Sequence, residues 1–170
     1  MSIEISQVFD GLVSQQLPAL KGLLIKAKAF TSANEYDDSA LLQTRLSEDM
    51  HPLKWQIQTA CELILRGRDR LTNHQPTNLN FEQDDFDALI QRVASIETEL
   101  STLDKNTLNL SADREFELPV GPDMVLTLSG RDYVLKFMLP NVYFHLTTTY
   151  AILRMKGVEI GKRDFMGPIL

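Results

Sequence analysis

Three histidines are the residues of this chain with the greatest potential for chemistry: His51, His74 and His145. His74 lies in the polar stretch NHQPTN, which predicts an exposed loop. His51 stands just before a predicted helix, and His145 falls on the apolar side of another. A histidine that faces the inside of a helical bundle is either a hydrogen-bonded core residue or part of a binding site. The sequence leaves both interpretations open for His145.

Two imidazoles together with a water or a carboxylate could hold a divalent metal such as zinc or nickel. Neither His51 nor His145 has a second histidine four residues further along, so the local pattern of a helical metal site is missing. A hydrogen-bonded core position is the commoner role of such a histidine. Alternatively, His51 and His145 converge on a small-ligand pocket, which Trp55 and Thr149 would line.

Trp55 and Cys61 lie on the same predicted helix but have different expected roles. The helical angle places Trp55 away from the apolar stripe, so it either lines a pocket, forms a dimer contact or packs under the hairpin that is predicted at about 114–129. Cys61 lies on the apolar stripe, and nothing nearby in the sequence would lower the pKa of its thiol. We therefore expect Cys61 to be a small core residue.

The charges argue against general binding to nucleic acids. The chain has 23 acidic and 17 basic residues, and its net charge is -6. Binding to DNA or RNA draws most of its non-specific affinity from a basic face. The basic residues Arg66, Arg68 and Arg70 crowd the end of one predicted helix, where cations complement the helix dipole and usually face solvent. Lys162, Arg163 and Asp164 are expected to form a surface turn.

The elements that must position these residues are mainly helical. Apolar residues recur at helical spacing in four long segments, 3–30, 52–71, 86–103 and 140–157, with a short helix after Asp38. Pro18 lies inside the first segment, where we expect a kink or break. Pro140 is expected to break a short helix that ends at Phe137 and to open the last long one.

One segment, at about 114–129, departs from the helical pattern. Apolar and polar residues alternate on both sides of the turn Gly121-Pro122-Asp123, which is typical of a β-hairpin. Pro119 marks an edge or a bulge in this hairpin. The sequence thus predicts a single mainly all-α domain over 1–170, a four-helix bundle with a small inserted hairpin.

The composition also favours a particular location. The only cysteine cannot form an internal disulfide. We see no leader pattern at the first residues and no run of roughly 20 apolar residues that would cross a membrane. The expected location is the cytoplasm, without a membrane partner.

Three segments together resemble a known family. They are RLSEDMHPLKWQIQTA at 45–60, LPNVYFHLTTTYAILRMKGVEIGKRDF at 139–165, and the hairpin between them. They resemble a bacterial domain-of-unknown-function family grouped with the DinB/YfiT-like metalloenzymes. The resemblance covers nearly the whole chain, and the C-terminal segment is its most specific part. It implies a four-helix bundle in an up-down-down-up arrangement, often as a homodimer.

The resemblance also implies a metal site held by three histidines, one from the start of the second long helix and two from an HxxxH pair on the last. His51 would approximate the first ligand and His145 the second, but Thr149 stands where the third would be. Threonine is a poor ligand for zinc or nickel, so the triad is incomplete. A carboxylate such as Asp49 could substitute. Some members of the superfamily are thiol-dependent transferases or isomerases.

Two main hypotheses follow. The first is a DinB-like bundle of unknown activity, a homodimer that is metal-free or binds metal weakly, in which a backbone or carboxylate group satisfies His145. The second is a divergent metal- or thiol-dependent transferase, or a small-ligand binder, that uses His51 and His145. A third is an interaction module built around Trp55. The sequence leaves open whether the protein is an enzyme.

Overall fold

The computed structural model describes residues 3–76 and 84–168. Four long helices form its body: α1 (Ile5–Ala33), α3 (Leu53–Leu71), α4 (Phe86–Leu100) and α7 (Leu139–Met155). The shorter elements are α2 (Asp38–Leu42), α5 (Lys105–Leu110), β1 (Glu115–Pro119), β2 (Val125–Ser129), α6 (Gly130–Asp132), η1 (Tyr133–Met138) and α8 (Lys162–Met166).

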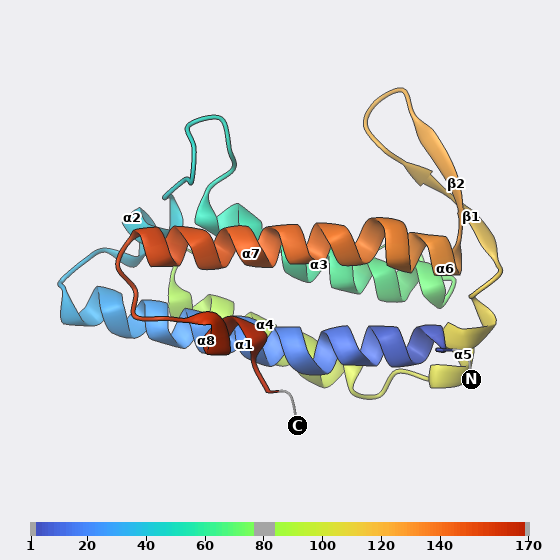
Figure 1. Cartoon of the computed structure of the whole chain (residues 1–170), viewed down its shortest axis with the longest axis horizontal. Helices are drawn as coiled ribbons and strands as arrows, with labels where there is room; N and C mark the ends of the chain where they lie inside the picture. Colours follow the sequence, from blue (N-terminus) through green and yellow to red (C-terminus); the bar gives the residue numbers. More distant parts are fainter. Residues whose placement is uncertain (1–2, 77–83, 169–170) are drawn as a thin grey trace.

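The four long helices run in the order up, down, down, up. α1 and α7 run in one direction, and α3 and α4 run in the other (Figure 1). α3 packs mainly against α7, and α1 packs mainly against α4. The shared core holds the apolar faces of all four helices, with Phe9, Phe86 and Tyr133 among its largest fully buried side chains. The predicted mainly helical fold is confirmed.

α1 corrects one sequence prediction. The helix continues from Ile5 to Ala33 through Pro18, where a kink or break was expected. Pro18 supplies no backbone N–H, so one helical hydrogen bond is missing. Its neighbours Leu17, Ala19 and Leu20 are all buried in the core. Packing of the apolar stripe on both sides of the proline therefore holds the helix together despite the local cost.

The predicted hairpin is present. β1 and β2 pair antiparallel, with Leu118 opposite Leu126 and Pro119 opposite Val125 at the tip. The hairpin projects from one end of the bundle (Figure 1). At its base, the ring of Phe116 meets that of buried Tyr133 edge to face, with centroids 5.1 Å apart. This contact fastens the hairpin to the helix that follows it.

The approach to α7 is a second correction. Ser129 caps a new helix, because its hydroxyl accepts a hydrogen bond from the backbone N–H of Asp132. The chain then stays helical to Met155, and Pro140 does not interrupt it. Six residues of π-helix precede α7. A π-helix has a wider turn than an α-helix, which gives the proline ring room that a regular turn would not.

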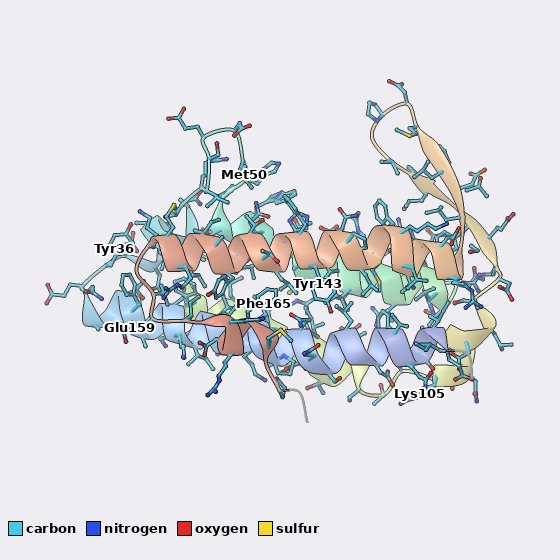
Figure 2. All side chains as sticks on the ribbon, viewed as in Figure 1. Tyr36, Met50, Lys105, Tyr143, Glu159 and Phe165 are labelled. Carbon is cyan, nitrogen blue, oxygen red and sulfur yellow. The ribbon has the colours of Figure 1, made fainter. Side chains whose placement is uncertain are left out.

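The C-terminal tail closes one side of the bundle. Asp164 pairs with Lys26 of α1 at 2.7 Å and also accepts a hydrogen bond from the backbone N–H of Gly161. Phe165, labelled in Figure 2, meets the ring of Tyr150 on α7 edge to face at 5.8 Å. The tail thus links α1 to α7. None of the helices in the described ranges is long and apolar enough to span a membrane.

Candidate functional site

His51 and His145 come together at the start of α3. His51 stacks on Trp55, with ring centroids 3.9 Å apart and planes inclined by 17°. The same indole meets His145 edge to face at 5.2 Å and 70°. The two histidines therefore contact one tryptophan, although 94 positions separate them in the sequence. We call His51, Trp55, Gln56, His145 and Thr149 the imidazole site.

Local structure fixes where His51 lies. It belongs to the loop that carries Met50, which projects from the bundle (Figure 2). The backbone N–H of Leu53 donates to the carbonyl of Thr44 at 2.8 Å, and the guanidinium of Arg45 donates to the carbonyl of Met50. Pro52 then ends the loop in an extended conformation, and α3 begins at Leu53. These contacts place His51 over Trp55, one helical turn further on.

His145 is buried, with 7% of its surface exposed. Its Nδ1 lies 2.7 Å from Oε1 of Gln56, and the Gln56 amide nitrogen donates to the backbone carbonyl of His51 at 3.0 Å. The expected backbone or carboxylate partner was wrong, because the partner is a side-chain amide. Gln56 was not among the candidates that the sequence indicated. The only feature that could have indicated it is its place in the sequence: Gln56 is a polar residue next to the core residue Ile57, on the buried face of α3.

The surroundings of His145 keep its imidazole neutral. Burial, together with the nearby His51, lowers the pKa of His145 from 6.5 to about 4. Burial acts in this direction because an apolar environment disfavours the charged form of a histidine. At neutral pH the ring therefore has one hydrogen and one nitrogen lone pair. Such a ring can accept a hydrogen bond and can also donate one.

Thr149 lies one helical turn beyond His145 and is fully buried. Its hydroxyl oxygen has no hydrogen-bond partner among the described residues. The neighbouring Thr148 differs, since its hydroxyl donates to the backbone carbonyl of Phe144 at 2.8 Å. An unsatisfied buried hydroxyl costs about 1–3 kcal/mol. A bound water or a polar group of a ligand could supply the missing partner.

The donors of the imidazole site do not match a three-histidine metal centre. Across the described residues, no group of three histidine, cysteine, aspartate or glutamate side chains is placed to hold a metal ion. Asp49 is exposed and accepts a hydrogen bond from the Ser47 hydroxyl at 2.7 Å within its own loop. His74 is exposed and its Nδ1 contacts the hydroxyl of Thr72. The imidazole site offers a metal ion two imidazoles and the hydroxyl of Thr149.

The remaining candidate residues have structural partners. Cys61 is fully buried, and burial raises the pKa of its thiol to about 12, which makes the thiol unreactive. Arg66 pairs with Glu62, and Arg68 pairs with both Asp69 and Glu99. These arginines are therefore engaged in ion pairs on and between α3 and α4.

An exposed aromatic residue borders the imidazole site. Phe144 is 56% exposed, and its ring meets His145 edge to face at 5.2 Å. Trp55 is half-buried and His51 is exposed. Exposure therefore falls from His51, past Trp55, to the buried imidazole of His145. A small molecule with an apolar part and one polar group would match this gradient.

Comparison with known proteins gives two matches over most of the chain. A family model described as "Domain of unknown function (DUF1993)" matches residues 9–166. The crystal structure of a DinB family member protein from Shewanella denitrificans is 32% identical in sequence and superposes with a TM-score of 0.84. The similarity covers 95% of this chain and 93% of that one. None of the curated proteins matches the chain.

Proposed function

The chain belongs to the DUF1993 family of DinB-like helical proteins, and from this premise we propose that it binds a small ligand at the imidazole site. The ligand would carry a hydroxyl or thiol group that donates a hydrogen bond to His145. One observation carries the proposal: two histidines from distant segments meet on a single tryptophan, and the inner one is buried.

The low pKa of His145 indicates how this residue would interact with such a ligand. Its pKa of about 4 is far below the pKa of a free thiol, about 8.5. Efficient general bases have a pKa near the working pH. His145 would therefore orient a thiol or a hydroxyl by accepting a hydrogen bond, and it would not remove the proton. If the protein is a thiol-dependent transferase, the step that activates the thiol needs another group.

The buried hydroxyl of Thr149 is a second observation that supports ligand binding. This hydroxyl has no partner among the described residues, so a polar group of the ligand would satisfy it. A ligand that bridges His145 and Thr149 would then gain two hydrogen bonds. Weak binding of zinc or nickel by the two histidines is a second form of the proposal, supported only by the convergence of their rings on Trp55.

Trp55 makes the proposal directly testable. It is the only tryptophan of the chain, so selectively excited tryptophan fluorescence reports on the imidazole site. The untagged protein would be titrated separately with a series of small thiols, a series of small alcohols, zinc and nickel. We expect a saturable change with a thiol or an alcohol. This change should be lost in Thr149→Val and kept in His74→Gln, which alters an exposed histidine outside the site.

Two outcomes would change the conclusion. Near-stoichiometric zinc, nickel or iron in the purified protein, absent from His145→Ala, would replace the ligand proposal with a metal centre. Elemental mass spectrometry measures this directly. A flat fluorescence response to every thiol, alcohol and metal would refute binding at the imidazole site.

We also propose that the protein is a homodimer and that it works in the cytoplasm. Large apolar side chains on the surface of α7 support the dimer, since Phe144 is 56% exposed and Met155 is 52% exposed. They are eleven positions apart, which corresponds to about 20° around a helix, so both lie on one side of α7. The single, buried cysteine suits a reducing compartment.

A further inference from the structure

A single buried amide connects the two histidines of the imidazole site. Gln56 is only 2% exposed. Its oxygen lies 2.7 Å from Nδ1 of His145, and its nitrogen donates to the backbone carbonyl of His51 at 3.0 Å. Gln56 therefore contacts α7 through one end of its amide and the loop before α3 through the other.

The orientation of this amide is fixed by its partners. A backbone carbonyl only accepts hydrogen bonds, so the amide NH₂ must face His51. A flipped amide would place two acceptor oxygens against each other and leave the buried NH₂ facing His145. The Gln56 oxygen must therefore face His145.

This orientation determines which nitrogen of His145 carries the hydrogen. An amide oxygen also only accepts, so Nδ1 of His145 must be the donor. A neutral imidazole has one N–H, and the hydrogen bond made by one nitrogen sets the state of the other. Nε2 is consequently left with its lone pair.

We propose that Gln56 is the positioning residue of the imidazole site, which holds His145 as the Nδ1–H tautomer and reserves Nε2 as a hydrogen-bond acceptor for the ligand. The preference for a ligand that donates follows from this tautomer. A hydroxyl, a thiol or an ammonium group can meet Nε2, whereas a carboxylate or phosphate would place an acceptor against an acceptor. The ligand preference rests on the proposed function, but the tautomer is a property of the free protein.

The first test is NMR of the full chain with ¹⁵N-labelled histidine at pH 7. His74→Gln and His51→Gln assign the three imidazoles by loss of signals. We expect the His145 ring to show a protonated Nδ1 and an unprotonated Nε2. A ring with the hydrogen on Nε2 would overturn the proposal, whatever the ligand turns out to be.

The second test separates positioning from simple structural support. Gln56→Met keeps the length of the side chain but removes both polar groups, and Gln75→Met is the matched control at an exposed glutamine outside the site. We expect Gln56→Met to remove the tautomer preference of His145. It should also weaken the binding of the thiol or alcohol that Trp55 fluorescence detects by roughly tenfold. Gln56→Glu retains an acceptor and should keep the hydrogen on Nδ1.

The two proposals fail differently. A merely structural Gln56 would lower the melting temperature of Gln56→Met while the tautomer and the ligand response stay as in the wild type, and this result would refute positioning. If the wild-type tautomer is Nδ1–H but no thiol or alcohol binds, the proposed function fails while the assignment of the tautomer to Gln56 stands.

Discussion

His145 is the central residue of the proposed ligand site, and its burial makes a prediction about pH. The pKa of His145 is about 4 in the folded state and 6.5 for an unperturbed histidine. A proton therefore binds the unfolded chain more readily than the folded one. The contribution of neutral His145 to stability is fully present above about pH 6.5 and is lost as the pH falls toward 4.

We expect the free energy of unfolding to drop by on the order of 2 kcal/mol over this interval because of His145, after a discount for solvent screening. Urea unfolding at pH 7.5 and pH 4.5 measures the drop. Carboxylates also titrate in this range, so the wild type is compared with His145→Gln. In that variant the free energy of unfolding should drop less between the two pH values, because the contribution of His145 is missing. Equal drops in the two proteins would show that His145 takes up no proton when the protein unfolds. His51→Gln separates the influence of the second ring.

At the scale of elements, the junction between α5 and α6 depends on a glycine. The N–H of Gly130 donates to the carbonyl of Arg114, and the N–H of Arg131 donates to that of Ala112, both at 2.9 Å. These bonds bring Gly130 so close to Ser111 that a Cβ atom at Gly130 would overlap the Ser111 carbonyl oxygen. The base of the hairpin therefore requires glycine for space, not for backbone conformation.

Gly130→Ala should lower the free energy of unfolding by about 2 kcal/mol or more, because backbone atoms would have to move. The matched control is Gly22→Ala in the interior of α1, where an added Cβ meets nothing within 4 Å. That change should raise stability by roughly 0.5–1 kcal/mol, since alanine favours a helix more than glycine does. Denaturant unfolding of both variants tests the pair. If Gly130→Ala leaves the free energy of unfolding unchanged, the junction is packed more loosely than its contacts indicate.

At the scale of the whole molecule, the exposed side of α7 supports association of two copies. We expect light scattering on a size-exclusion column to give twice the chain mass of 19.3 kDa at micromolar concentrations. Phe144→Ser and Met155→Ser should each shift the protein toward the monomer, because large apolar side chains at the centre of an interface carry much of its affinity.

Leu110→Ser is the control for that experiment. Leu110 is 84% exposed, but it lies on α5, which packs mainly against α1. Its replacement should leave the mass unchanged. A wild-type protein that elutes as a monomer would refute the homodimer, and a dimer that survives both α7 variants would place the interface elsewhere.

The sequence by itself determined the elements of this protein. Helical spacing of apolar residues predicted the four long helices, and alternation around Gly121-Pro122-Asp123 predicted the hairpin, because both patterns are local properties of the chain. The prolines were predicted less well. Pro18 and Pro140 are both accommodated within helical chain, since burial of their neighbours and a π-helical segment outweigh a local preference that sequence patterns overstate.

Only the tertiary structure decided what the imidazole site contains. His51, Trp55 and His145 were candidates from residue type, and their convergence depends on how α3 packs against α7. Gln56 gave almost no signal, because its role requires a partner 89 positions away. The unpartnered hydroxyl of Thr149 was equally invisible, since burial and the lack of a partner are properties of the packed core. Periodicity encodes which face of a helix is buried, whereas the contacts between helices depend on the packing of all four.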